Sequence, residues 1–160
     1  MNFEPQRQHQ FLQQLVGEWT YEGDCSMGAG KPRVRSTGSE RVRSLGGCWV
    51  VAVGQGEMPG CGAATTMMTL GFDRQKQRYV GSWVGSMMSH LWVYDGVIDA
   101  SGRALTLNAE GPSLSGDGKL SKYQDVIELK SDDYRVLRAL VMNDDGTWNE
   151  FMTTHYRRWV

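Results

Sequence analysis

The sequence predicts an all-β protein: a closed antiparallel up-and-down (meander) β-barrel of about ten strands with one short N-terminal helix. Glycine-rich and Asp/Asn-rich segments recur along the 160 residues at the interval expected for short strands joined by tight turns. After the first turns of the chain, apolar and polar residues follow no clean helical period. An open sheet of about ten strands would leave two exposed edges, whereas a closed barrel leaves none.

The helical pattern lies at the start of the chain. Pro5 suits a first helical position, and Gly17 ends the run. The apolar residues between them recur at helical spacing: Phe11, Leu12, Leu15 and Val16. Residues 18–27 then alternate, with Trp19 on the apolar side, which predicts a first strand with one buried face and one wet face.

Nine further strands are expected at residues 33–44, 48–58, 63–73, 78–86, 90–99, 103–111, 122–130, 134–142 and 147–158. In the first of these, period two places the arginines outward and Glu40 on the inward face. Because no linker or fixed-length repeat divides the chain, we expect residues 1–160 to form one calycin-like domain.

The stretch 81–96 predicts the shape of the barrel interior. If residues 86–89 form a loop, the facing pairs are Gly85 with His90, Trp83 with Trp92, and Gly81 with Tyr94. In two of these pairs a glycine stands opposite an aromatic ring, and all three pairs lie on one inward face. Glycines placed in this way let a curved sheet accommodate aromatic side chains. About ten strands should leave an internal cavity unless the barrel is flattened.

Charge and composition limit the partners. The formal net charge is −1 and the isoelectric point about 6.3, so nothing indicates binding to nucleic acid or to an anionic membrane. No signal peptide pattern or run of about 18 apolar residues is present, and we expect a cytoplasmic protein. The unpaired spacing of Cys25, Cys48 and Cys61 favours free, reduced thiols.

The segment VGEWTYEG, a Gly-x-Trp directly after a short helix, resembles the start of calycin barrels such as lipocalins, fatty-acid-binding proteins and nitrobindins. In lipocalins an arginine of the last strand packs over that tryptophan, and HYRRW supplies Arg157 and Arg158 for Trp19. With MMTLGFD, WVYDG and EFMTTHYRR, nearly the whole chain resembles a bacterial family of unknown function with a calycin-like barrel. That resemblance implies the fold, with no assigned reaction, cofactor or substrate.

Two departures from these relatives concern ligands. Nitrobindins hold haem through a histidine near the C-terminus that is followed by several residues and an arginine, whereas His155 is followed at once by YRR. Fatty-acid-binding proteins grip a carboxylate with Arg-x-Tyr, whereas this chain has the reverse order, Tyr156-x-Arg158. The resemblance therefore does not predict haem, and no cofactor is expected.

We predict that ten residues line a ligand site: Trp19, Glu40, Trp83, His90, Trp92, Tyr123, Asp125, Glu150, Tyr156 and Arg158. The alternative for His90 is rim packing or a hydrogen bond to the backbone. The alternative for the three carboxylates is a structural salt bridge to Arg158 or Arg138. We expect no metal, because a lone histidine supplies at most one ligand where zinc needs three or four.

The register of the last hairpin decides which of these residues point inward. If Asp145 and Gly146 make a two-residue turn, the inward face of residues 134–158 carries Leu137, Ala139, Val141, Glu150, Met152, Thr154, Tyr156 and Arg158. The outward face then carries Arg138, Leu140, Phe151 and His155. Tyr156 and Arg158 would orient an anionic or carbonyl group, unless Arg158 covers Trp19 instead. A longer loop would exchange the two faces.

Three functions remain open. No catalytic motif is present, and Cys61 in PGCGA has no assignable base, so the leading hypothesis is non-enzymatic binding of a small, largely apolar or amphipathic molecule in the barrel. The second is a homodimeric structural or interaction protein with a filled barrel, because CWVVAV and RVLRALVM are apolar on both faces. The third is an enzyme acting through Glu40, Asp125 or His90, or a haem protein.

Overall fold

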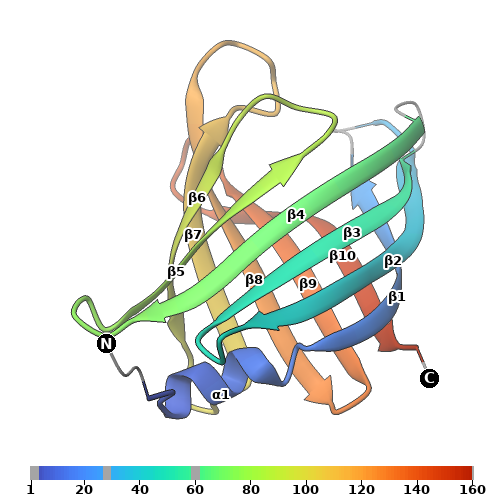
Figure 1. Ribbon diagram of the computed structural model, residues 1–160. Coiled ribbons are helices and arrows are strands. Elements are labelled where there is room, and N and C mark those ends of the chain that lie inside the picture. The colour runs from blue at the N-terminus through green and yellow to red at the C-terminus, as the bar shows by residue number, and fades with distance from the viewer. Residues whose placement is uncertain (1–3, 27–29, 59–61, 160) are drawn as a thin grey trace.

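The computed structural model describes residues 4–26, 30–58 and 62–159. Helix α1 (Arg7–Gln13) precedes ten strands: β1 (Gly17–Ser26), β2 (Arg33–Leu45), β3 (Trp49–Met58), β4 (Gly62–Asp73), β5 (Arg78–Gly85), β6 (Trp92–Ile98), β7 (Ala104–Pro112), β8 (Leu120–Ser131), β9 (Tyr134–Met142) and β10 (Trp148–Arg158). Consecutive strands pair antiparallel, and β10 pairs with β1 to close the barrel (Figure 1). The predicted closed meander barrel is confirmed.

Charged residues alternate along β1 and β2 because most of them point to the outer wall of the barrel. Opposite charges on the two strands form ion pairs, directly across the ladder for Glu18 with Arg41 and diagonally for Asp24 with Arg33 and Glu22 with Arg35. The intervening side chains, Trp19, Tyr21 and Glu40 among them, therefore point into the barrel.

Helix α1 crosses one end of the barrel, which we call the closed end (Figure 1). The helix begins at Arg7, so the expectation of Pro5 as its first residue is wrong. His9 Nδ1 accepts a hydrogen bond from the Gln6 backbone N–H at 2.8 Å and thereby closes the first turn after Pro5. Gly17 has φ of +140°, a conformation that suits glycine, and there the chain turns into β1.

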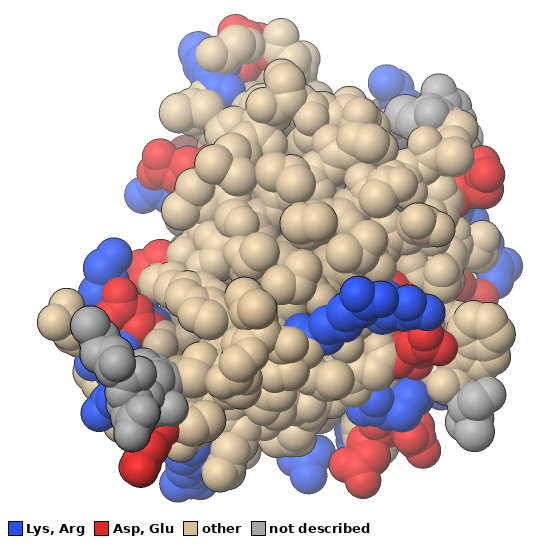
Figure 2. All heavy atoms as spheres, viewed as in Figure 1, with Lys and Arg blue, Asp and Glu red and all other residues tan. Residues whose placement is uncertain are grey.

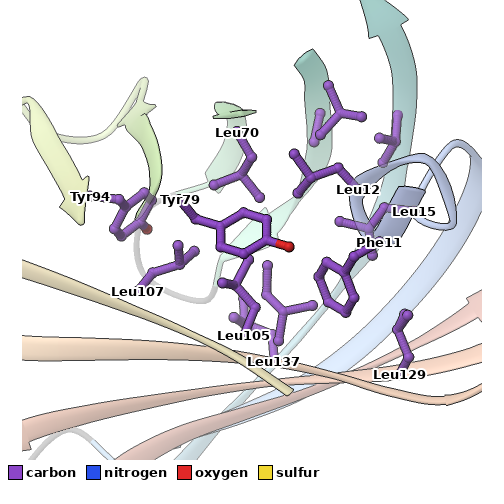
Figure 3. Close-up of a cluster of buried hydrophobic side chains, with 14 of the residues drawn as sticks. Phe11, Leu12, Leu15, Leu70, Tyr79, Tyr94, Leu105, Leu107, Leu129 and Leu137 are labelled. Atoms are coloured by element: carbon purple, nitrogen blue, oxygen red, sulfur yellow. The ribbon is translucent and has the colours of Figure 1, made fainter. Parts of the chain in front are cut away.

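The closed end is tightly packed. Phe11, Leu12 and Leu15 of the helix meet inward side chains of several strands, and Tyr79 lies at the centre of this cluster (Figure 3). Leu12 and Leu105 are completely buried. The Tyr79 hydroxyl donates to the Gln8 carbonyl at 3.0 Å, so the helix is fastened to β5 by a hydrogen bond as well as by apolar contact.

The opposite end, which we call the open end, is formed by the connections at residues 86–91, 113–119 and 143–147, among others. In the part of the chain that the structure describes, no helix covers it. Several large inward side chains near it are only partly buried, although they contact the core: Tyr21, Met68, Trp83 and Trp92. The side chains packed under the helix are therefore fully buried, whereas these large inward side chains are not.

The β5–β6 hairpin follows the predicted register for two of its three pairs. Trp83 faces Trp92 and Gly81 faces Tyr94, as expected. Gly85 and His90 are not paired, because residue 86 hydrogen-bonds back to β4: the Ser86 N–H donates to the Thr65 carbonyl at 2.9 Å. The chain at residues 86–91 is thus a loop, and His90 lies in it.

Candidate functional site

Six polar residues face one another inside the barrel, and we call them the polar inner cluster: Tyr21, Glu40, Tyr94, Asp125, Arg135 and Tyr156. The strand register brings them together from six strands. Tyr156 of β10 pairs with Tyr21 of β1 on one side and with Arg135 of β9 on the other. On each strand every second side chain points inward, so these polar residues share the inner face of the barrel. Together they form a belt of polar groups above the packed closed end.

Arg135 is the buried cation of this cluster, with 3% of its surface exposed. Its guanidinium lies 3.8 Å above the Tyr156 ring and 4.7 Å from the Trp19 ring, and its Nη2 donates to Glu40 Oε1. A buried charge needs such a partner, since an unpaired guanidinium would cost several kcal/mol (~3–5). Arg135 Nε, also buried, has no acceptor among the residues described.

Glu40 uses only one of its carboxylate oxygens in this ion pair. Within the described chain, Oε2 receives no hydrogen bond, and 13% of the Glu40 side chain is exposed. Gly54 stands beside Glu40 on β3, and a Cβ placed there would lie 3.8 Å from Oε2. That Cβ would also lie 2.6 Å from Thr66 Oγ1, so the Thr66 side chain occupies the space next to Gly54.

Asp125 is the second carboxylate. It accepts a hydrogen bond from the Tyr94 hydroxyl at 2.5 Å. Burial raises the pKa of Asp125 from 3.8 to about 6, and the Tyr94 hydrogen bond limits the rise. Burial, and then the nearby Asp125 carboxylate, raises the pKa of Tyr94 well above 10. Tyr94 therefore stays a hydrogen-bond donor to Asp125 at neutral pH.

The hydroxyls of Tyr21 and Tyr156 complete the cluster. Their rings lie 5.3 Å apart, and neither hydroxyl has a hydrogen-bond partner in the described part of the chain. Burial, and then the Glu40 carboxylate, raises the pKa of both tyrosines. Both phenols thus remain protonated at neutral pH, and each can donate and accept one more hydrogen bond.

An aromatic chain borders the open end. His90, Trp92, Tyr123 and Phe151 contact one another edge to face, with centroid distances of 4.8, 4.9 and 6.1 Å in that order. His90 Nε2 is 3.0 Å from the Glu110 carbonyl oxygen, which ties the ring to the backbone of β7. His90 is thus a rim residue held by packing and by a backbone hydrogen bond.

Trp19 and Arg158 lie at the closed end, and Trp19 borders the polar inner cluster, because it pairs with Glu40 and lies under Arg135. Arg158 stands 4.2 Å above the Trp19 ring, as in the lipocalin arrangement. Its guanidinium also donates to three backbone carbonyls, those of Val16 (2.7 Å), Asp132 (3.0 Å) and Gln14 (3.1 Å). With its donors engaged there, Arg158 serves to join β10 to the segment between α1 and β1.

The last hairpin has the predicted inward register from Met152 to Tyr156, but Glu150 is a correction. A β-bulge between Glu150 and Met152 shifts the pairing, so Glu150 faces Leu140 on the outer wall and is exposed. The extra residue, Phe151, contacts the inward Tyr123 ring instead of lying on the outer face. His155 is outward as expected, and its Nδ1 is 2.7 Å from the Tyr134 hydroxyl.

The structure brings some predicted site residues together and separates others. Glu40, Asp125 and Tyr156 share the polar inner cluster, while Trp83, Trp92, Tyr123 and His90 lie nearer the open end. The carboxylate partner was predicted as Arg158 or Arg138, but Glu40 pairs with Arg135, and Arg138 lies outside near Glu128. Period two could have identified Arg135, because it places this residue on the inward face with Leu137.

Two hollows are found on the outer surface of the part of the molecule that the structure describes. One of about 440 Å³ lies over the outer faces of β1, β2 and β3, between charged side chains such as Glu18 and Arg41 and the exposed Trp159. Another of about 310 Å³ lies beside the end of α1 and Arg158. Both are open to solvent, and the first is also bordered by Trp19 and Glu40. We regard the polar inner cluster and its aromatic rim as the candidate site, because most of the predicted site residues gather there.

The structure also bears on metal binding, on the cysteines and on membrane-spanning helices. Among the described residues, no three His, Cys, Asp or Glu side chains gather as a metal would require. Cys25 and Cys48 are free thiols, whereas Cys61 lies outside the described residues. No helix in the described segments has the length and apolarity to span a membrane.

Comparison with known proteins places the chain by its fold and family. The crystal structure of Rv2717c from M. tuberculosis is similar with a TM-score of 0.70 and 11% identity, covering 98% of this chain and 100% of that one. An S-type phycobiliprotein lyase, CPES from Guillardia theta, is similar with a TM-score of 0.65 and 9% identity, covering 94% of this chain and 92% of that one. No curated protein matches the sequence. A family model described as "Protein of unknown function (DUF1579)" matches residues 4–158, and the chain therefore belongs to that family.

Proposed function

We propose that this protein is a non-enzymatic binding module that holds one small, largely apolar molecule inside the barrel, entering through the open end. The observation that carries the proposal is the change in burial along the barrel. Closed-end residues such as Leu12 and Leu105 are fully buried, whereas the inward-facing Trp83, Trp92 and Tyr21 are only partly buried. Large apolar rings that face an interior without being covered are typical of a ligand pocket.

The walls near the open end support this assignment. Inward positions between the middle of the barrel and the open end include small residues, among them Ala64, Ala109 and Ala139. A ten-stranded barrel whose walls carry small side chains has room for a ligand, whereas bulky residues would fill it. The same walls argue against the filled-barrel hypothesis, which requires tight packing along the whole axis.

The side chains of the candidate site fit a binding function better than an enzymatic one. The polar inner cluster holds hydrogen-bonding groups, but Arg135 is committed to Glu40 and Tyr94 to Asp125. His90 is tied to a backbone carbonyl at the rim. The likeness to a lyase concerns the fold alone, because one fold hosts many unrelated functions. Free Cys25 and Cys48 are consistent with the cytoplasmic location that we propose.

Titration with N-phenyl-1-naphthylamine, a neutral apolar fluorophore, tests the proposal. We expect saturable fluorescence enhancement with one site per chain. Val141 is inward and partly buried beside Tyr123, so Val141→Trp should fill the pocket and weaken binding about tenfold or more. Val97→Trp is the matched control, because Val97 is 42% exposed on the outer face of β6 and should leave affinity unchanged.

Two results would contradict this function. The first is a parent protein that gives no saturable signal with the fluorophore. The second is equal affinity in the folded Val141→Trp and Val97→Trp variants, which would move the bound fluorophore to another surface. Circular dichroism and thermal unfolding of both variants confirm that folded proteins are compared.

We further propose that two copies associate through the outer face of β3, β4 and β5. Val53, Met67 and Val84 are neighbours across these strands, and Met67 and Val84 are 44% and 42% exposed. Figure 2 shows a broad uncharged area over β4 and β5. The other segment expected to need cover, on β9, lacks such an area: its outward Val136 is already buried and stands beside Glu128 and His155.

A further inference from the structure

The inference concerns the chemistry of the ligand, and it rests on the proposed binding function. Among the inward strand residues that the structure describes above the closed end, the carboxylates and basic side chains are Glu40, Asp125 and Arg135. Two carboxylates against one guanidinium leave one net negative charge when Asp125 is ionised. In a cavity of low dielectric constant such an imbalance attracts a cation and opposes an anion.

The two arginines that could have bound an anion have most of their donors engaged, and the one donor of Arg135 without an acceptor in the described chain, Nε, is buried. Arg135 is paired with Glu40, stacked on Tyr156, and only 4% of its side chain is exposed. Arg158 lies at the closed end with its donors on three backbone carbonyls. The expectation of an anionic group held by Arg158 therefore has no support in this geometry.

The cluster offers a ligand hydrogen-bond acceptors, and its two tyrosine hydroxyls can also donate. Glu40 Oε2 receives no hydrogen bond within the described chain, and 13% of the Glu40 side chain is exposed. The Tyr156 hydroxyl is a second group available to a ligand, because it makes no hydrogen bond within the described chain and is not fully buried. A ligand that bonds to it gains a hydrogen bond in a largely enclosed place.

We propose that the open end binds a protonated amine carried on an apolar body, with Glu40 Oε2 accepting a hydrogen bond from the ammonium group. The Tyr156 and Tyr21 hydroxyl oxygens accept the remaining ammonium protons, and Asp125 adds negative charge. The apolar body lies against Trp83 and Trp92, whose ring faces also attract a cation as it enters. The ligand class is thus a lipophilic amine and not a fatty acid.

Three probes with one chain and different head groups test this assignment. Dodecylamine, dodecanol and dodecanoate are each used to displace N-phenyl-1-naphthylamine at pH 7.5, below their critical micelle concentrations. We expect dodecylamine to bind about tenfold or more tightly than either of the others, which is the effect of one charge-assisted hydrogen bond. This ranking needs no variant and therefore does not depend on how a substitution folds.

A charge-changing variant locates the effect. Glu40→Gln keeps the shape of the side chain but releases Arg135 from its counter-ion, so the preference for dodecylamine should disappear and dodecanoate should gain about tenfold. Glu57→Gln is the matched control, because Glu57 is exposed on the outer face of β3 and the same charge is removed there. It should leave the ranking unchanged.

The outcomes separate this inference from the proposed function. If the fluorophore binds but dodecanoate or dodecanol displaces it as well as dodecylamine does, the amine assignment is wrong while the binding function stands. If the fluorophore binds and none of the three displaces it, the amine assignment is also wrong. If the fluorophore itself fails to bind, the proposed function fails.

Discussion

Asp125 illustrates how one buried residue couples stability to pH. Its folded-state pKa of about 6 lies above its ordinary value of 3.8, because burial penalises the charged form. The folded protein therefore binds this proton more tightly than the unfolded chain does. The resulting stabilisation is fully present below pH 4 and is lost as the pH rises through 6, by up to about 3 kcal/mol.

Asp125→Asn should remove this dependence. The asparagine oxygen can still accept the Tyr94 hydrogen bond, and one of the two carboxylates beside Tyr156 is removed while Glu40 remains. We expect the variant to exceed the parent in free energy of unfolding by about 1–3 kcal/mol at pH 8 and to match it near pH 4. Urea unfolding at both pH values measures the difference, and a variant that is less stable than the parent at pH 8 would refute the burial argument.

Residue patterns predicted the inward faces but not the partners across the barrel. Period two placed Glu40 and Asp125 inward, and period two with an assumed two-residue turn did so for Tyr156; the structure confirms these faces. The pairing of Glu40 with Arg135 joins strands β2 and β9, which are not neighbours in the sheet. Such a contact depends on the diameter and shear of the closed barrel, which local sequence does not report.

At the scale of the elements, Arg158 links the end of the last strand to the segment after the helix. Arg158→Met keeps much of the apolar stem over Trp19 but deprives the carbonyls of Gln14, Val16 and Asp132 of their donor. We expect the free energy of unfolding to fall by about 2–4 kcal/mol. Affinity for the fluorophore and the head-group ranking should stay the same, because Arg158 lies at the closed end.

Chemical denaturation and the displacement assay together check this prediction. Arg157→Met is the matched control, since the Arg157 side chain is exposed and contacts the Tyr134 ring on the outer wall. Its cost should stay below about 1 kcal/mol. Loss of probe binding in a folded Arg158→Met protein would instead place that arginine in the ligand site.

The elements that sequence reasoning predicted best are those with strong alternation. All ten strands were expected near their observed positions, since glycine and Asp/Asn turns mark their ends. The helix start was misplaced because proline is acceptable both at the first helical position and just before the cap. The bulge at Glu150 and Phe151 was missed because an extra residue leaves no compositional mark in a strand of mixed polarity.

At the scale of the whole molecule, the barrel that the described strands close has no free strand edge with which a second copy could pair. Two copies can therefore associate only through outer faces of the barrel. The outer wall of β1 and β2 carries ion pairs, whereas that of β3 to β5 presents neutral rows: Val51, Thr69 and Ser82, then Val53, Met67 and Val84. With rows about 7 Å apart and strands about 4.8 Å apart, this face extends over a few hundred Å². An area of that size is typical of a weak interface.

We therefore expect a symmetric dimer with a dissociation constant in the micromolar range, and Met67 near its centre. In a two-fold interface each copy presents the same patch, so Met67→Glu would bring two carboxylates together and add repulsion to desolvation. Sedimentation should then show a 17.9 kDa monomer at concentrations where the parent is dimeric. Thr20→Glu, a matched change at an exposed position on the charged wall of β1, should leave the dimer intact. A parent that sediments only as monomer at 100 µM would show that this uncharged face has no second copy as its partner.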